Sequence, residues 1–151
     1  MLTKLPRQVE YAIIALADMQ KAHPGQLFAV RALCERRNIP FDVMSKTMQR
    51  LARAKILRSV KGAGGGYQII KDLEHVSLLD VIEAVQGAVS AVNCLTENGN
   101  CPHTGDCDVV GSMQFLDDKL KELYRTMSVL ELLDSSGCSG KDGIQQVEIK
   151  T

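Results

Sequence analysis

Residues 29–70 read AVRALCERRNIPFDVMSKTMQRLARAKILRSVKGAGGGYQII, and the spacing of apolar and turn-forming residues in this stretch decides the fold. Apolar side chains recur at helical spacing over residues 29–37 and again over residues 41–54. Asn38-Ile39-Pro40 leaves room only for a tight connection between them, because proline cannot continue a helix. Two short helices joined by such a turn predict a helix-turn-helix motif.

The residues that follow the second helix predict a β-hairpin. Apolar and polar residues alternate over residues 56–61 and 67–70, and glycines fill most of the intervening residues 62–66. Glycine supplies the positive φ of a tight turn and lets the backbone approach another surface closely. These glycines are not a phosphate-binding P-loop, because no Gly-Lys-Ser/Thr sequence follows them. We therefore expect a mostly α-helical fold with a small β-hairpin wing, a winged helix-turn-helix.

Two further helices are expected on either side of this stretch. Pro6 fits the first turn of a helix that continues to Gln20, because a proline at that position has no hydrogen bond to lose. Ser77 and Asp80 have the spacing of a capping box, with Asp where Glu or Gln is usual, and predict a helix that ends at Gly87. Both helices carry apolar residues at helical spacing, as a buried helix face requires.

A long helix is predicted to begin near Asp108. Its apolar residues are separated alternately by four and three positions, the spacing of a heptad seam. Its remaining faces are charged, so pairing with a second chain is favoured over burial against the same domain. Ser128 and Glu131 indicate a break and a new short helix, so the seam would end near Met127. The apolar positions with this spacing are Val109, Met113, Leu116, Leu120, Leu123, Met127 and Leu130.

Charge is divided strongly along the chain, although its net value is zero. Residues 1–71 hold 13 Lys and Arg against 4 Asp and Glu, whereas residues 72–151 hold 5 against 14. Such a division indicates that the first half of the chain meets a polyanion. Together with the helix-turn-helix and the wing, it favours double-stranded DNA as the partner, with the second helix of the motif in the major groove.

The outward face of that second helix and the hairpin carry the residues that we expect to touch DNA. Lys46 and Arg50 lie one helical turn apart, so both are expected to face the groove. Asp42 and Ser45 lie at the N-terminal end, where base edges are nearest, and an Asp can accept a hydrogen bond from cytosine. The basic residues of the hairpin suit phosphate or a narrow minor groove. The predicted DNA-binding residues are Asp42, Ser45, Lys46, Gln49, Arg50, Arg58 and Lys61.

The chain has five cysteines, an odd number that argues against a disulfide scaffold. Cys34 falls on the apolar face of the first motif helix and is expected in the core. Cys94, Cys101 and Cys107 share one polar loop with the spacing C-x6-C-x5-C. Three thiolates suit an iron–sulfur cluster that takes a fourth ligand from elsewhere, whereas zinc normally uses closely spaced ligand pairs. An iron–sulfur cluster is favoured, with a cluster-free thiol redox sensor and a zinc-stabilised DNA-binding protein as the alternatives.

Length and composition place the chain among globular proteins. It has 151 residues, of which 45% are hydrophobic and 24% charged. No apolar run reaches the ~18 residues of a membrane-spanning helix, and the charged N-terminus lacks a signal-peptide cleavage site. We expect a cytoplasmic protein without a membrane partner. Its three histidines show no pairing with a nucleophile, so neither an enzyme nor a small-molecule substrate is expected.

These features divide the chain into four parts. Residues 1–86 are expected to form the winged helix-turn-helix DNA-binding domain, and residues 87–107 the cysteine loop that binds the cluster. Residues 108–134 would form the dimerisation helix and a short C-terminal helix. The Gly- and Ser-rich residues 135–151 are predicted to be a disordered tail, with Cys138 as an unassigned thiol.

The order of these features resembles the IscR/NsrR/RirA family of bacterial winged-helix regulators. The wing followed by three loop cysteines is the specific combination, and the resemblance covers roughly residues 1–134. The matching segments are Val-Glu-Tyr-Ala at residues 9–12, Leu-Ala-Arg-Ala-Lys-Ile-Leu at 51–57, Val-Lys-Gly-Ala-Gly-Gly-Gly-Tyr at 60–67, the helix at 77–86, the cysteine loop, and Val-Leu-Glu-Leu-Leu at 129–133.

This resemblance implies a transcription regulator, a repressor or an activator, that forms a homodimer through a long crossing helix and binds a pseudo-palindromic operator. It implies an iron–sulfur cluster held near the dimer interface by Cys94, Cys101 and Cys107. A 4Fe–4S cluster is favoured over a 2Fe–2S cluster. Regulators of this family use the cluster to report iron supply, redox state or nitric oxide.

The fourth ligand differs between members of the family. The IscR pattern has a His three residues after the third cysteine, where this chain has Val110. The NsrR pattern brings an acidic side chain from the first helix of the other subunit, immediately before a tyrosine, and here that residue is Glu10. We expect Glu10 to act in trans, with His103 as the local alternative. Ser45 and Lys46 stand where IscR has Glu and Gln, so its operator sequence is not carried over.

Overall fold

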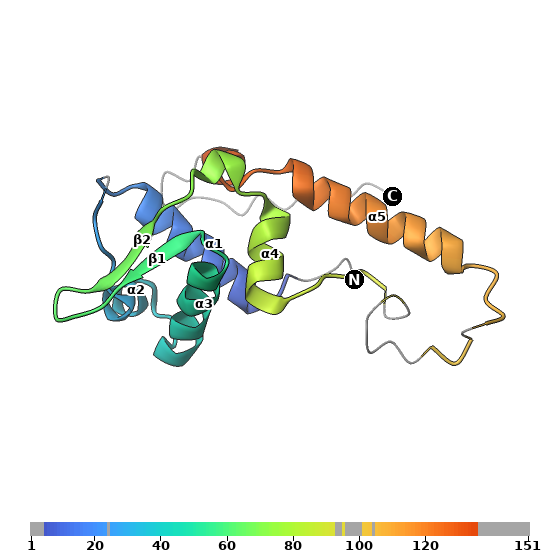
Figure 1. Ribbon diagram of the computed structural model, residues 1–151, viewed down its shortest axis with the longest axis horizontal. Coiled ribbons are helices and arrows are strands. Elements are labelled where there is room, and N and C mark those ends of the chain that lie inside the picture. Colours follow the sequence, from blue (N-terminus) through green and yellow to red (C-terminus); the bar gives the residue numbers. More distant parts are fainter. Residues whose placement is uncertain (1–4, 24, 93–94, 96–100, 104, 136–151) are drawn as a thin grey trace, which may run out of the picture.

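The chain folds into helices with a small hairpin at one end, as drawn in the computed structural model of Figure 1. Cys94, Cys138 and the predicted tail beyond Ser135 lie outside the described residues. The residues that the structure describes are 5–23, 25–92, 95, 101–103 and 105–135.

Within these residues, six α-helices and one antiparallel pair of strands confirm the mostly α-helical fold with a hairpin wing. The predicted helices and strands are present, with ends shifted by a few residues at most. One short 3₁₀ helix before α4 was not anticipated. The elements are α1 (Arg7–Gln20), α2 (Val30–Arg37), α3 (Phe41–Arg53), β1 (Leu57–Val60), β2 (Gly66–Ile69), the 3₁₀ helix η1 (Leu73–His75), α4 (Leu78–Gln86), α5 (Val110–Thr126) and α6 (Val129–Ser135).

Helices α2 and α3 form the predicted helix-turn-helix. Asn38 ends α2 in the left-handed region at φ +52°, which asparagine adopts more readily than most residues. Ile39 is buried and anchors the turn in the core, and Pro40 directly precedes α3. Leu33 and Cys34 turn into the core from α2, which confirms Cys34 as a core residue.

Strands β1 and β2 pair antiparallel, with Val60 opposite Gly66. Phe28 adds a bridge to this pair, because its N–H donates to the carbonyl of Tyr67 at 2.8 Å and its carbonyl accepts from the Tyr67 N–H at 2.9 Å. A Cβ on Gly66 would lie 2.5 Å from the Phe28 carbonyl oxygen, so only glycine fits there. Gly62 turns the chain at φ +111°. Both glycine roles expected from the sequence, close approach and positive φ, are confirmed.

Helices α1 and α4 contribute much of the core. Val9, Ala12 and Leu16 of α1 are fully buried, and α1 packs against both α3 and α4. The Ser77 hydroxyl oxygen accepts from the Asp80 N–H at 3.0 Å, and the Asp80 carboxylate accepts from the Ser77 N–H at 2.9 Å. The capping box is thus confirmed at the start of α4, even with the shorter acidic residue.

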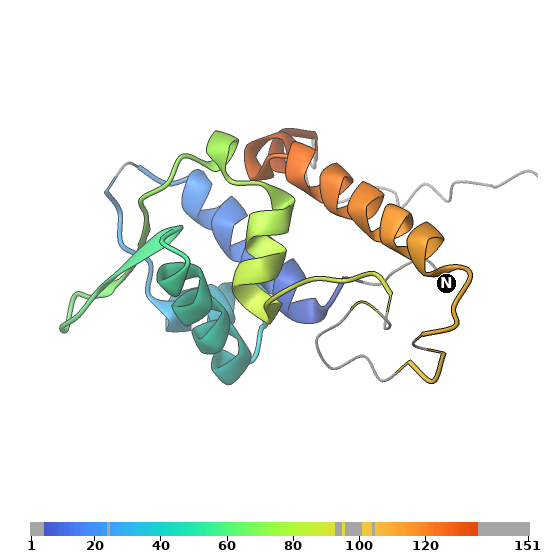
Figure 2. The same cartoon turned by 45° about the vertical axis from the view of Figure 1, so that its right-hand side comes forward.

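The chain breaks after α5, as predicted, and returns to the core. The Leu78 N–H donates to the carbonyl of Met127 at 2.8 Å, and the Val129 N–H donates to the carbonyl of Val76 at 2.8 Å. Val129 is fully buried. Helix α6 is therefore packed on the winged-helix domain, whereas α5 runs out from it toward the cysteine loop (Figure 2).

Asp18 ties α1 to α2 through two arginines. Its carboxylate accepts from Arg37 Nε at 2.9 Å and from Arg37 Nη2, and Arg36 Nη2 lies 3.0 Å away. The hydrogen bonds from Arg37 outweigh the effect of burial and lower the pKa of Asp18. A carboxylate that is buried and bound in this way fixes the first helix of the motif against the core.

Replacing Asp18 with Asn should lower the free energy of unfolding at neutral pH by about 1–2 kcal/mol, because charge-assisted hydrogen bonds are lost to arginines that solvent partly screens. The folded-state pKa of Asp18 is lowered, so the stabilisation is complete above the ordinary aspartate pKa and disappears as pH falls through the lowered value. Urea denaturation of both proteins from neutral to acid pH measures this. Glu35→Gln, on the exposed side of α2, is the control and should show little change.

Candidate nucleic-acid interface and cysteine loop

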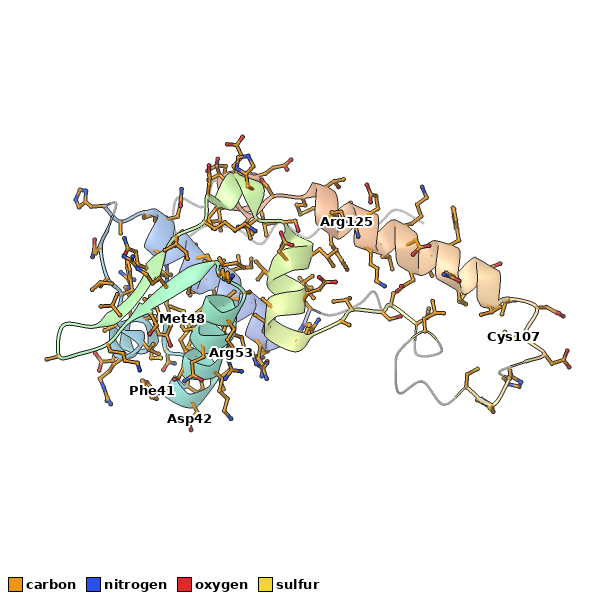
Figure 3. All side chains as sticks on the ribbon, viewed as in Figure 1. Phe41, Asp42, Met48, Arg53, Cys107 and Arg125 are labelled. Carbon is orange, nitrogen blue, oxygen red and sulfur yellow. The ribbon has the colours of Figure 1, made fainter. Side chains whose placement is uncertain are left out.

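Helix α3 has one buried face and one exposed face. Met44, Met48 and Leu51 are fully buried on the first. The exposed face is formed by residues at the i, i+3, i+4 and i+7 positions, which lie on one side of a helix. Figure 3 shows Asp42 at the outer end of α3, away from the core. The predicted DNA contacts brought together on this side are Asp42, Lys46 and Gln49, all exposed, and the half-buried Ser45.

Arg50 is placed differently from the expectation that it would face the groove beside Lys46. Its Nη1 donates to Gln8 Oε1 of α1 at 2.8 Å and to the carbonyl of Val85 in the last turn of α4. The last carbonyls of a helix have no partner within the helix and carry partial negative charge, so they attract a guanidinium. Arg50 therefore joins α3 to α1 and α4.

The two basic hairpin residues remain available at the surface. Lys61 follows β1 and is exposed, and Arg58 is exposed while its Nη2 donates to Gln68 Oε1 at 2.7 Å. An open groove of about 530 Å³ runs between α3 and the hairpin. Arg53 and Lys55 line it together with Arg58, which adds two cations that the sequence reasoning left out of the interface.

Phe41 is a surface aromatic at the first position of α3. Its side chain is 46% exposed, and Arg31 Cζ of α2 lies 5.5 Å from the ring centroid, within the range of a cation–π contact. Figure 3 shows Phe41 beside Asp42 at the outer end of the helix. The sequence reasoning assigned Phe41 no role. The available signal was an aromatic residue at the start of a helix whose apolar face begins two residues later.

Of the three loop cysteines, Cys107 lies at the opposite end of the molecule from the hairpin (Figure 3). Cys101 and Cys107 are both half-buried, and His103 between them is exposed. Their thiols are the soft donors that iron–sulfur clusters take, and residues 101–103 and 105–107 around them lie in turns and irregular chain. Burial raises the pKa of the Cys34 thiol, which lies in the core and not in this loop.

Asp117 of α5 holds the start of this loop. Its side chain is buried and accepts from the Ala91 N–H at 2.6 Å and from the Ser90 hydroxyl at 3.2 Å, while Lys121 Nζ lies 2.7 Å away. Burial alone would raise the pKa of Asp117, but these three partners together lower it. An ionised carboxylate thus fixes residues 90–92 against α5.

Glu10 lies in the first turn of α1 and is exposed. It precedes the half-buried Tyr11, as the sequence comparison with the NsrR pattern requires. Its carboxylate is accessible from outside the chain, which is the condition for donation to another subunit.

Helix α5 exposes an apolar stripe. Leu116 and Leu123 are 44% and 52% exposed, and Val109, one heptad earlier, is 55% exposed. Phe115 beside them is 65% exposed, with Lys119 Nζ 5.5 Å from its ring centroid. Only Asp117 of this helix is fully turned inward. Three of the seven predicted seam residues are therefore available for a partner, whereas Met113, Leu120, Met127 and Leu130 are half-buried.

Comparison with known proteins identifies the family. The family model for Rrf2, described as an iron-dependent transcriptional regulator, matches residues 5–135. The chain belongs to the Rrf2 family. The transcriptional regulator IscR of Enterobacter sp. (strain 638) is 26% identical over 143 residues, which cover 95% of this chain and 87% of the relative.

Solved structures show the same fold in other Rrf2-like proteins. CymR, the global cysteine regulator of B. subtilis, is 17% identical with a TM-score of 0.66, covering 89% of this chain and 99% of that chain. IscR of T. potens is 18% identical with a TM-score of 0.68, covering 95% and 96%.

Membership of the Rrf2 family confirms the resemblance found in the sequence. It establishes a DNA-binding transcription regulator and confirms that the chain is not an enzyme, because this family is non-enzymatic. Within the described ranges, no helix combines the length and the apolar character needed to cross a membrane.

Proposed function

We propose that this Rrf2 protein is a homodimer that binds a pseudo-palindromic operator and regulates transcription according to the state of an iron–sulfur cluster. The observation that carries the proposal is the link between the two candidate sites. The cysteine loop begins directly after α4, and Arg50 of α3 binds the carbonyl of Val85 in the last turn of α4. The loop is therefore connected to α3 through α4, and this connection would transmit a change in the conformation of the loop to the DNA-reading helix.

Cys94, Cys101 and Cys107 would hold the cluster, with Glu10 of the partner subunit as the fourth ligand and His103 as the local alternative. A bound cluster supplies a centre that reacts to iron supply, oxidants or nitric oxide, and a 4Fe–4S cluster remains favoured over a 2Fe–2S cluster. The family description and the IscR relative support iron. The chain's own contribution is the anchoring of the loop by Asp117 and its connection to α3.

The DNA contacts proposed on α3 are those of its exposed face. Asp42 and Ser45 would read base edges, and Lys46 and Gln49 would reach the groove one turn further along. Arg58 and Lys61 would lie against phosphate or the minor groove. Arg50 would act on DNA affinity by holding α3 in place. Coupling of this kind typically changes affinity about 5- to 150-fold.

Anaerobic purification followed by iron, acid-labile sulfide and zinc analysis tests the cluster. We expect near-stoichiometric iron and sulfide with a visible absorption band in the wild type. Cys101→Ser and Cys107→Ser should lose most of the iron, because each removes a thiolate ligand. Glu10→Ala should keep the iron and change the spectrum or shorten the lifetime of the cluster, because only the fourth ligand is altered.

Cys34→Ala and Cys138→Ser are the matched controls, since each removes one thiol outside the loop and should leave the iron content unchanged. Zinc in place of iron would support the zinc-stabilised alternative. A metal-free wild type whose DNA affinity changes on thiol oxidation would support the thiol redox sensor. Either result would overturn the cluster.

DNA affinity should depend steeply on salt. If the dimer contacts about 6–10 phosphates, affinity falls by about 10³–10⁵ between about 50 mM and 200 mM salt, because condensed counterions are released on binding. Lys61→Ala should weaken binding to all sequences and reduce the slope of log affinity against log salt by about 2, which is about 1 for each subunit of the dimer. Fluorescence anisotropy with a labelled duplex measures both.

Arg125→Ala is the control for this measurement. Arg125 is an exposed cation of α5, paired with Glu122 at 2.8 Å and placed away from the hairpin in Figure 3. It should leave the salt slope unchanged. Equal slopes for Lys61→Ala and the wild type would remove the wing from the proposed interface.

A further inference from the structure

The exposed ring of Phe41 has no explanation in the folding of the domain. Phenylalanine is usually buried, yet this side chain is 46% exposed. Among the residues that the structure describes, it is the only exposed aromatic outside α5. It occupies the first position of the helix that the proposed function places in the major groove, next to Asp42 (Figure 3).

Arg31 holds this ring from the neighbouring helix. Its Cζ lies 5.5 Å from the ring centroid, so the cation restricts the ring without covering it. Arg31 is itself exposed on α2, the helix that crosses the DNA backbone in a helix-turn-helix complex. The same guanidinium is thus available to a phosphate while it orients the ring.

The chemistry of the major groove suggests what such a ring would meet. Thymine alone among the four bases presents an apolar group there, its C5-methyl, and phenylalanine is among the side chains that contact it. Asp42 and Ser45, which lie near Phe41 on α3, offer oxygen atoms that can form hydrogen bonds with the edges of the bases. An apolar ring at the same end of α3 therefore complements them by reading a methyl group.

We propose that Phe41 is a specificity-determining residue that contacts the C5-methyl group of a thymine in each half-site of the operator, with Arg31 as the positioning residue. This inference rests on the proposed function of α3 as the recognition helix. Phe41 adds an apolar contact to the polar contacts expected from the exposed face of α3. Arg31 acts on the preference for thymine through the orientation of the ring.

The test replaces thymine by uracil, which removes only the methyl group and keeps every hydrogen-bonding atom. The probe is a duplex selected from a random pool by the wild-type protein, with each thymine replaced in turn. Loss of one buried methyl should weaken wild-type binding about fourfold at one position of each half-site. Phe41→Ala should bind the thymine and uracil duplexes equally, and Phe41→Leu should retain part of the preference.

Arg31→Gln separates positioning from contact. It should reduce the preference for thymine without abolishing it, because the ring remains but is no longer held. It should also reduce the salt slope by about 2, which is about 1 for each subunit of the dimer. Phe115→Ala is the control, since Phe115 is a 65% exposed aromatic of α5, with Lys119 Nζ 5.5 Å from its ring centroid, and lies outside the proposed DNA interface. It should keep the full preference for thymine.

The outcomes separate this inference from the function on which it rests. A wild type that binds no duplex would overturn the proposed function and the role of Phe41 with it. Binding without any uracil-sensitive position, or a thymine preference that persists in both Phe41→Ala and Phe41→Leu, would overturn the role of Phe41 alone. Circular dichroism and thermal melting of each variant show that the domain is folded when binding is measured.

Discussion

Leu116→Glu is expected to convert the proposed dimer into a monomer. Leu116 is 44% exposed on the apolar stripe of α5, so the substitution leaves the isolated chain folded while placing a carboxylate in the proposed interface. In a two-fold dimer the change occurs twice. The exposed parts of two leucines are no longer buried, which costs about 1–3 kcal/mol, and placing two carboxylates against apolar surface adds several kcal/mol. The dimer dissociation constant should rise by at least about 100-fold. Sedimentation equilibrium over a range of concentrations measures it.

Gln114→Glu is the matched control. It adds the same carboxylate to the same helix, and Gln114 is exposed on the side of α5 opposite Leu116, since successive residues turn by ~100°. This variant should remain dimeric. A monomer has one recognition helix for two half-sites. Operator affinity should therefore fall in Leu116→Glu, which loses the dimer, and should be unchanged in Gln114→Glu. A dimer that tolerates Leu116→Glu would show that the stripe is not the interface.

Asp117→Ala should destabilise the fold and release the start of the cysteine loop. The buried carboxylate accepts from the Ala91 N–H and the Ser90 hydroxyl and pairs with Lys121. Its loss leaves these donors without their charged acceptor, a cost of about 2–3 kcal/mol in the free energy of unfolding. Chemical denaturation measures that loss. Maleimide labelling of Cys101 and Cys107 should be faster than in the wild type, because the chain that leads to them is no longer fixed.

Asp118→Ala provides the comparison at the next residue. Asp118 is exposed, so its replacement should change the stability by less than about 0.5 kcal/mol and leave the labelling rate unchanged. The contrast between adjacent carboxylates isolates the buried hydrogen bonds from the general charge of α5. If both variants label at the wild-type rate, Asp117 does not control the loop.

The candidate functional residues were predicted from two kinds of sequence pattern, the close spacing of the cysteines and the periodicity of α3 and the hairpin. The cysteines stand close together in sequence, so their spacing alone indicated a shared site. Lys46 and Lys61 could be predicted as DNA contacts because each lies on a local element whose exposed residues follow from the periodicity of the sequence. Phe41 and Lys55 escaped notice because an exposed aromatic and a groove between two elements have no periodic signature.

Local order in this chain was determined by the sequence itself. Three local features show this: the turn at residues 38–40, the capping box at Ser77 and the break near Met127. Each involves residues within a few positions of one another. Their interactions form within one or two turns, so their residue types specify the geometry directly. The winged-helix class, the apolar seam and the core position of Cys34 follow from such patterns.

Only the tertiary structure decided which charged side chains are available to a partner. Arg50 meets Gln8 and Val85, which lie 42 and 35 positions away, so no local pattern could show that its guanidinium is engaged within the fold. Asp117 looked like one more charge on a solvated helix face, yet it is buried because residues 90–92 fold back across α5. Long-range hydrogen bonds depend on how distant segments pack, which no short-range periodicity encodes.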